Sequence, residues 1–425
     1  MSKCRQCTKG FDVMQEDMVF YKKMEVPEPT LCLACRFQRR TAYRNERVFY
    51  KRACTLCQKS IVTIYSSDKP FPVYCVSCFW SDRWDPLKYG QNFDFSRPFF
   101  EQWRILRDQV PRLALISKNS ENSEYTNHAV GNRNCYMSMI LFGSEEVYFS
   151  RKVFFSKSVC DSAYIISHGE RLYECFWCSD IFDSRYSAFC RNSSNLQFCY
   201  DCRGCSDCFM SSNLRNKKYV FQNQQFSEEE YGAKIKSIDW GSHKTIEKCK
   251  AKYVELIHQA LKPTLRNENS ENSTGDFLFH TKDCFECYYS HYGDNCRYCV
   301  EFDLSANNQG AKHCMDCFGF GASEWLYEVN GQANGYNNRF CNLSYDVADS
   351  QYLDICYNLK NCFACIGLHS QERFCIFNKR YSKEDYEVLT AKVIAHMRKT
   401  GEYGEFFPVS MSPLGYNETL AQEFF

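Results

Sequence analysis

The sequence predicts a mainly β protein with flanking helices, in which two N-terminal zinc ribbons precede a duplicated β-solenoid-like body. Three observations lead to this fold class. Four C-x-x-C pairs lie near the N-terminus, the rest of the chain contains two copies of one unit, and short β segments recur at regular steps within each copy. Many short strands at regular steps, with small residues at the same phase, favour a solenoid over a sandwich. A β-meander or barrel in each copy remains an alternative.

The four cysteine pairs are expected to form two zinc ribbons in series, within residues 1–50 and 51–95. Two thiolates separated by two residues supply half of a tetrahedral Zn²⁺ site. The segments from Cys7 to Cys32 and from Cys57 to Cys75 leave room for a short hairpin in each ribbon. We therefore expect two Zn²⁺ ions, one held by Cys4, Cys7, Cys32 and Cys35 and the other by Cys54, Cys57, Cys75 and Cys78.

Positive charge is concentrated at the N-terminus. Residues 1–60 contain 13 Lys and Arg against 6 Asp and Glu, although the whole chain has a net charge of only +1. If residues 35–52 are helical, steps of three and four place five of these cations on one face, with two more beside it. A solvated helix face is the alternative, but only Glu46 supplies an internal counter-charge. We expect phosphate contacts from Arg36, Arg39, Arg40, Arg44, Arg47, Lys51 and Arg52.

An internal duplication organises the rest of the chain. The segment NSENS occurs at 119–123 and at 269–273, and residues 160–174 align without a gap on residues 314–328. We expect a helical connector at 96–118, one β-rich copy with closing helices at 119–262, a second copy with a closing helix at 263–400, and a tail at 401–425. Ser227 and Ser382 each begin an S-x-x-[ED] capping pattern, and Gly401 is expected to end the second closing helix.

The cysteines of the body have two interpretations. Several repeat the C-x-x-C spacing and could bind metal, yet free cysteine is also a small buried hydrophobe that would stack inside a solenoid. In the second copy Leu359 stands opposite Cys202, and Val329 and Gln332 stand opposite Cys175 and Cys178. Such replacements suit core positions better than metal ligands, so we expect stacked core cysteines.

Composition excludes several classes of protein. No apolar run approaches the length that spans a bilayer, and no signal peptide precedes the first cysteine pair. The 29 cysteines are therefore expected to be reduced, in a soluble cytoplasmic protein without a membrane partner. We find no G-x-S-x-G, H-E-x-x-H or P-loop motif, and we name no catalytic residue.

Two parts of the chain resemble known families. Cys4-x-x-Cys7 to Cys32-x-x-Cys35-Arg36 resembles a small probable zinc-ribbon domain of bacterial proteins, and Cys54-x-x-Cys57 to Cys75-x-x-Cys78 is similar to a ribbon found beside some RNA helicases. NSENS, the cysteine ladder, 213–217, and the segments 404–407 and 415–418 resemble a cysteine-rich zinc-binding protein family of candidate-phyla (Patescibacteria) bacteria. The resemblance covers almost the whole chain and implies zinc binding, but no activity.

The leading functional hypothesis is a non-enzymatic zinc-binding protein that contacts RNA through its ribbons, with the ribosome as a candidate site, and protein partners through its β-rich body. One alternative is a structural or assembly scaffold that makes protein contacts without nucleic acid. Another is a cysteine-rich metal-handling protein or enzyme.

Overall fold

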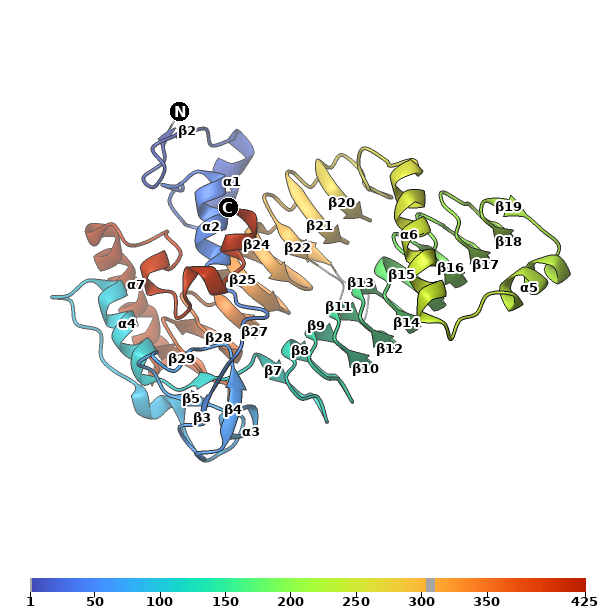
Figure 1. Cartoon of the computed structure of the whole chain (residues 1–425). Helices are drawn as coiled ribbons and strands as arrows, with labels where there is room; N and C mark the ends of the chain where they lie inside the picture. Colours follow the sequence, from blue (N-terminus) through green and yellow to red (C-terminus); the bar gives the residue numbers. More distant parts are fainter. Residues whose placement is uncertain (1, 303–309) are drawn as a thin grey trace. The chain divides into compact units, whose positions relative to one another are not determined.

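A computed structural model describes residues 2–302 and 310–425 and is mainly β (Figure 1). The chain divides into two compact units. One comprises Met1–Ala114 together with Leu265–Phe425, and the other comprises Leu115–Thr264. Each unit contains a ladder of short parallel strands, the β-solenoid expected from the sequence, and the ladders appear in Figure 1 in green and in yellow to orange.

The solenoid formed by Leu115–Thr264 has short coils, most of which repeat after twelve residues. Glu145 pairs with Lys157 in a parallel ladder, and Arg151 pairs with Ala163 in the same way. The last two strands form an antiparallel hairpin that ends the stack. Its strands are β7 (Ser117–Lys118), β8 (Asn127–Val130), β9 (Met139–Phe142), β10 (Glu145–Tyr148), β11 (Arg151–Phe154), β12 (Lys157–Cys160), β13 (Ala163–Ile166), β14 (Glu170–Tyr173), β15 (Phe176–Arg185), β16 (Arg191–Gln197), β17 (Ser206–Phe209), β18 (Lys218–Phe221) and β19 (Gln224–Gln225).

The other unit contains a solenoid of the same design. Tyr345 pairs with Tyr357, which is the same step along the chain, and an antiparallel hairpin again ends the stack. Its strands are β20 (Gly275–Phe279), β21 (Cys287–His291), β22 (Val300–Phe302), β23 (Ala311–Lys312), β24 (Met315–Phe320), β25 (Ser323–Ala333), β26 (Gly335–Arg339), β27 (Asn342–Ala348), β28 (Tyr357–Phe363), β29 (Arg373–Ile376) and β30 (Lys379–Arg380). The duplicated solenoid is therefore confirmed.

A corner with positive φ occurs at every third residue, so each coil has four sides of three residues. Between Asn134 and Ser167 the corners are held mostly by residues other than glycine, including the β-branched Ile140 at φ 58°. That conformation is unfavourable for such a residue. Hydrogen bonds to neighbouring coils hold such corners in place, as when Met137 N, at a corner with φ 44°, donates to Glu124 O at 3.2 Å.

The residue after each corner points into the coil, and the narrow interior holds mainly serine, cysteine and aliphatic side chains. Leu141, Val147 and Val153 lie there, fully buried. Phe302 and Phe320 of the other solenoid are exceptions, and the Phe302 ring fits because Gly293 beside it has no side chain. The hydroxyl of Ser150 donates to Tyr148 O at 2.8 Å and accepts from Ser162 N at 3.1 Å, so interior serines also join successive coils.

Body cysteines occupy the same interior positions. Cys199 donates through its thiol to Gln197 O and to Cys208 O, at 3.6 and 3.4 Å. Cys202 and Leu359 are both buried in the cores of their own solenoids, as their correspondence in the two copies predicts. The stacked-core interpretation therefore describes these cysteines.

One extra corner residue changes the phase of the solenoid formed by Leu115–Thr264. Ser167 and His168 both have positive φ, and Lys157 pairs with Glu170, one residue beyond the usual step. As a result Cys160, before the extra residue, lies half-buried on the outside of its coil, whereas Cys314 is buried inside. The gap-free alignment of 160–174 with 314–328 is therefore wrong at its start.

Helices close both solenoids as expected. Helix α5 (Glu228–Lys236) begins with a reciprocal capping box between Ser227 and Glu230, and α6 (His243–Gln259) follows it. Helix α7 (Lys383–Thr400) begins where the Ser382 hydroxyl accepts from Asp385 N, and it ends at Gly401 with φ 73°. The connector contains α4 (Phe99–Gln109), and α8 (Ala421–Phe424) lies at the end of the chain.

The N-terminal segment differs from expectation in one respect. The basic helix is short: α2 spans Leu33–Thr41, and the helix expected over 35–52 is wrong beyond Thr41. Asn45 is one reason, because its side-chain oxygen accepts from Arg47 N and Val48 N and so offers the backbone a turn in place of a helix. The remaining N-terminal elements are β1 (Ser2–Lys3), β2 (Gly10–Phe11), α1 (Gln15–Lys23), β3 (Tyr50–Ala53), β4 (Ser60–Thr63), β5 (Val73–Tyr74), α3 (Val76–Phe79) and β6 (Arg112–Leu113).

Candidate metal centres and the buried arginine cluster

Each four-cysteine cluster combines a hairpin turn with the start of a helix. Cys4 and Cys7 lie in the turn between β1 and β2, and Cys32 is the N-cap of α2. Cys54 and Cys57 lie in the turn between β3 and β4, and Cys75 is the N-cap of α3.

The two turns have the same backbone hydrogen bonds. Thr8 N donates to Cys4 O at 3.0 Å, and Gln58 N donates to Cys54 O at 2.9 Å. Thr8 and Gln58 both have φ 62°. The same local structure therefore presents both pairs of thiols.

The four sulfur atoms of each cluster lie at distances that a single metal ion requires. All four fall within 4.8 Å of one another in both clusters, and the serial assignment of the ligands matches this grouping. The Cys7 and Cys32 sulfurs are 3.7 Å apart, and the Cys57 and Cys75 sulfurs are 3.9 Å apart. Four sulfurs at about 2.3 Å from a tetrahedral Zn²⁺ are about 3.8 Å apart. Both clusters could therefore hold a metal ion.

Local hydrogen bonding favours the thiolate at one cysteine of each cluster. Burial raises the pKa of Cys4, but backbone N–H groups of Cys32, Cys7 and Gln6 outweigh it and lower this pKa to about 6. The same holds for Cys54. Burial raises its pKa, but backbone N–H donors lower it to about 6, and one of them, Cys75 N, lies 3.3 Å from the Cys54 sulfur. Thiolates are the form that binds metal.

Body cysteines do not form such clusters. Within residues 2–302 and 310–425, no further group of three or more ligand atoms lies within 4.8 Å of one another. Burial raises the pKa of most of these thiols, as at Cys341, whose pKa is raised to about 12.

The arginines of α2 are buried in ion pairs with acids from distant parts of the same unit. Arg36 pairs with Asp316 at 2.9 Å, and Arg40 pairs with the same carboxylate at 3.2 Å. Arg39 pairs with Glu328 at 2.7 Å and also with Glu405. The side chains of Arg40 and Asp316 are completely buried, so these charges stabilise the packing of α2 against β24 and β25.

The other cations predicted to contact nucleic acid lie in different surroundings. Arg44 is buried and pairs with Glu46 at 2.7 Å. Arg47 is half-exposed and pairs with Glu423, whereas Lys51 is exposed on β3. Arg52 is half-buried, and burial lowers its pKa. The seven residues therefore do not form one exposed helical stripe: Arg36, Arg39, Arg40 and Arg44 face protein.

The acids that pair with α2 were missed in the sequence. Asp316 stands in C-M-D-C and Glu328 in W-L-Y-E-V, so both are isolated acids among small or apolar residues of a strand. Burial raises the pKa of Glu328, an effect that Arg39 and Arg40 oppose. A buried acid requires a partner charge, but Asp207 in the similar C-S-D-C is only half-buried and accepts from Asn195, so the sequence pattern alone does not indicate the pairing.

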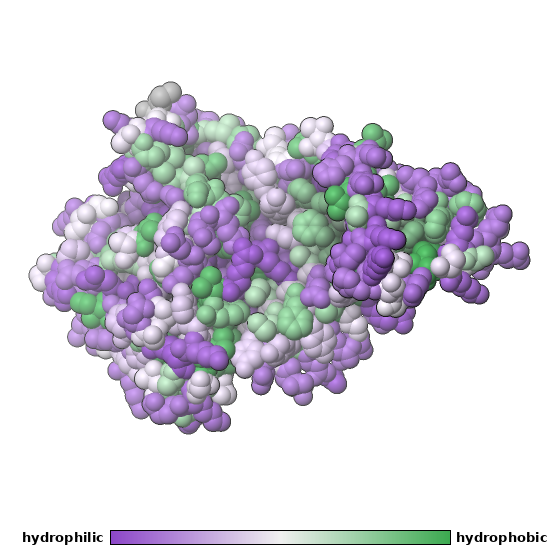
Figure 2. Space-filling model, viewed as in Figure 1, coloured by the Kyte–Doolittle hydropathy of each residue, from purple (hydrophilic) through white to green (hydrophobic). Residues whose placement is uncertain are grey.

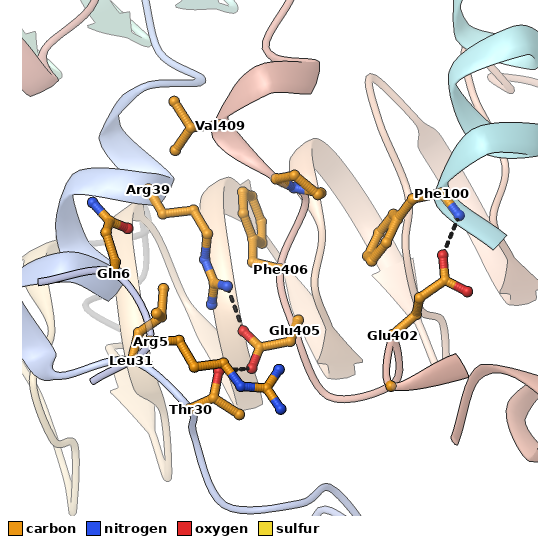
Figure 3. A pocket seen from close by; sticks show the side chains of 12 residues that line it. Arg5, Gln6, Thr30, Leu31, Arg39, Phe100, Glu402, Glu405, Phe406 and Val409 are labelled. Atoms are coloured by element: carbon orange, nitrogen blue, oxygen red, sulfur yellow. Dashed lines mark hydrogen bonds and ion pairs between the residues drawn. The ribbon is translucent and has the colours of Figure 1, made fainter. Parts of the chain in front are cut away.

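A cavity of about 390 Å³ lies beside the arginine cluster, between the first metal cluster and α4 (Figure 3). Glu402 accepts from the backbone N–H groups of Phe99 and Phe100, at 2.9 and 2.8 Å, and so caps α4. Glu405 accepts from Thr30 and Arg39. Both acids thus join structural elements, and the residues that line the cavity include no cysteine or histidine that could act as a nucleophile or base.

Comparisons with known proteins assign no family. No family model matches the chain, and no curated protein matches it either. A solved structure of a protein assigned as an acetyltransferase from Desulfovibrio desulfuricans G20 is 10% identical, over 64% of this chain and 68% of that one, with a TM-score of 0.11. A similarity of this size carries no argument about fold or function. Within the part of the chain that the structure describes, no helix is long and apolar enough to cross a membrane.

Proposed function

We propose that this protein is a cytoplasmic, non-enzymatic scaffold in which two Zn²⁺ ions stabilise the N-terminal segment and the solenoids present surfaces to protein partners. The observation that favours this function is the use of the arginines of α2. Arg36, Arg39 and Arg40 are buried against Asp316, Glu328 and Glu405, so the most basic part of the chain serves internal packing. Zn²⁺ is the ion that four cysteine thiolates at these distances favour in structural sites.

The metal would act on folding. Cys32 is the N-cap of α2 and Cys35 lies in its first turn, directly before Arg36. An ion bound by these cysteines would fix the start of the helix whose next turns contact the solenoid. Elemental analysis of the purified protein tests this assignment. We expect about two Zn²⁺ per chain; clearly more would place metal among the body cysteines and favour the metal-handling function.

RNA or ribosome binding remains a second proposal, now limited to Arg47, Lys51 and Arg52. It is favoured by the position of Lys51, exposed on the strand that leads into the second metal cluster. Replacing all three by Glu should abolish co-sedimentation with ribosomes at roughly 100 mM salt and leave the zinc content unchanged. Absence of salt-sensitive absorbance at 260 nm in the purified wild-type protein would instead favour the scaffold.

A further inference from the structure

One outer face of the solenoid formed by Leu115–Thr264 carries aromatic residues in two adjacent columns on most of its coils, and the coil at Cys160 and Asp161 is the exception. Ladder pairing aligns Tyr136 with Tyr148, and the same column continues coil by coil to Phe209 and Phe221. We call this the aromatic face; it consists of Tyr125, Tyr136, Met137, Tyr148, Phe149, Tyr173, Tyr186, Phe198, Phe209 and Phe221.

The chain itself covers the later half of this face with α6 and the segment before it. The Tyr253 hydroxyl donates to Cys199 O at 2.8 Å, and its ring lies 5.8 Å from Phe198. Trp240 contacts Phe209 edge-on at 6.0 Å. As a result Phe198 is 0% and Phe209 3% exposed.

This contact also has an electrostatic part. Lys250 of α6 pairs with Glu174 at 2.9 Å and lies over the Tyr186 ring at 5.2 Å. Helix α6 contains four lysines and two glutamates. The solenoid therefore binds a basic amphipathic helix on this face, within its own chain.

The earlier half of the face is uncovered but has the same chemistry. Phe149 is 56% exposed, Tyr148 and Tyr173 are each 39% exposed, and Met137 is 38% exposed. Single exposed aromatic residues are normal, but Tyr125, Tyr136 and Tyr148 lie on three successive coils, and Tyr173 lies two coils further on. A cluster of this kind marks an interaction site. Figure 2 shows a mosaic of hydrophilic and hydrophobic residues on the face that it displays, and tyrosines are pale there because they rank near the middle of that scale.

Acidic residues accompany the uncovered half. Glu124 and Asp161 lie in the same two columns as the aromatic residues, and Glu146 lies at the adjoining corner, whereas Glu174 is already paired with Lys250 of α6. Arg171, at the same corner, pairs with Asp183 at 3.7 Å and stacks over Phe182. Arg133 and Lys157 of the next column both lie near Glu145, at 3.9 and 3.7 Å. This surplus of negative charge favours a basic partner and disfavours a nucleic-acid backbone.

We infer that the uncovered half of the aromatic face binds a basic amphipathic helix of a partner protein, in the way that α6 binds the covered half. The five coils from Tyr125 to Tyr173 extend over about 19 Å at about 4.8 Å per strand. A helix of about 13 residues matches this length. The inference deepens the proposed scaffold function by naming the kind of partner.

A fluorescein-labelled peptide with the sequence of residues 242–261 provides a suitable probe, because it reproduces the helix that already binds this face. We expect saturable binding to the full-length protein, measured by fluorescence anisotropy. Phe149→Ser together with Tyr148→Ser should weaken it at least tenfold. Phe182→Ser is the matched control: Phe182 is 40% exposed on the neighbouring column of the same solenoid, and its loss should change affinity less than twofold. Loss of binding in the Tyr148 and Phe149 variant also separates binding here from exchange with α6, because these substitutions leave the contacts of the covered half at Phe198 and Phe209 intact.

Substitution of charged residues provides a second test of the inference. Glu124→Gln, Glu146→Gln and Asp161→Asn together should lower the affinity and flatten its dependence on salt, while a peptide with its four lysines replaced by Glu should not bind. Absence of saturation by 1 mM peptide would overturn the inference. The inference would also be overturned if the protein dimerises, or binds an oligouridylate, and Phe149→Ser removes that association. Either result would identify a different occupant of the aromatic face. None of these outcomes alters the zinc content, so failure here is distinguishable from failure of the proposed function.

Discussion

Replacement of Asp316 by Ala should release α2 from the solenoid of its own unit. Asp316 accepts from both Arg36 and Arg40, and its side chain and that of Arg40 are completely buried. Removing the carboxylate leaves two buried guanidinium groups that share fewer counter-charges. Breaking a buried ion pair from one side costs about 3–5 kcal/mol, because the remaining charge loses its partner without regaining water. We expect the free energy of opening of α2 to fall by this amount.

Native-state hydrogen exchange of the α2 amides measures that opening free energy directly and does not require two-state unfolding of the whole chain. Arg47→Ala is the control. Arg47 also pairs with an acid, Glu423, but its side chain is 53% exposed, so its removal should cost less than about 1 kcal/mol. If Asp316→Ala changes the protection of α2 by no more than Arg47→Ala does, the buried pairs do not hold this helix and the argument for a packing role of the arginines fails.

Three further predictions concern the cysteines. Cys4→Ser and Cys54→Ser should each reduce the zinc content from about two ions to about one per chain; loss of both ions or of neither from a single substitution would contradict two independent sites. Since the pKa of Cys4 and Cys54 is lowered to about 6 from 9.0, their contribution to stability is complete above about pH 9 and is lost as the pH falls to about 6. The urea midpoint of the chelator-treated protein should therefore decrease over this range, and the double Ser variant should lack that decrease. In the body, Cys202→Ser should be tolerated and should leave zinc unchanged, whereas Cys202→Phe should destabilise by about 1–3 kcal/mol in thermal unfolding. Cys202 lies among Cys190, Cys199 and Cys205, without a glycine of the kind that makes room for the ring of Phe302. Equal effects of the two substitutions would be inconsistent with a tightly packed interior.

The period of the solenoids could be predicted from the sequence because the interior residues repeat with it. Cys202 and Leu359 are interchangeable in a core but not at a metal, and both lie inside their coils. The cysteine ligands were equally accessible, because each pair is local and the turns that present Cys4 and Cys54 depend on neighbouring residues alone.

The three-residue phase of the coils was not predicted. Left-handed corners are usually marked by glycine or asparagine, but here residues such as Ile140 and Met137 occupy them. Their conformation is imposed by the coils above and below, so no single triplet shows it. For the same reason the extra corner at His168 could not be seen, and Cys160 was aligned with Cys314, although only Cys314 lies inside its coil.

The surroundings of the arginines depend on contacts between residues far apart in the chain. Arg36 and Asp316 are separated by 280 residues. A spacing of three and four residues places cations on one face of a helix, and this spacing is the same whether the face contacts water or acidic side chains. Isolated acids within the strands do not distinguish the two cases, because Asp180 is exposed and Asp207 half-buried, whereas Asp316 and Glu328 are buried.

A square coil with three-residue sides encloses few apolar atoms, so much of its stabilisation has to come from its outer faces. Large aromatic side chains each bury about 150–250 Å² when they are covered. In the unit that contains α2, such residues are covered by helices of the same unit: Phe99 of α4 packs against Tyr352 and Phe363. In the other unit α6 covers Phe198 but leaves Tyr148 and Phe149 exposed. Those residues lie on the same face, in the same register and beside the same kind of acid as the ones that α6 covers. The uncovered half therefore lacks an element that the fold supplies elsewhere, which favours a helix from another protein in that position.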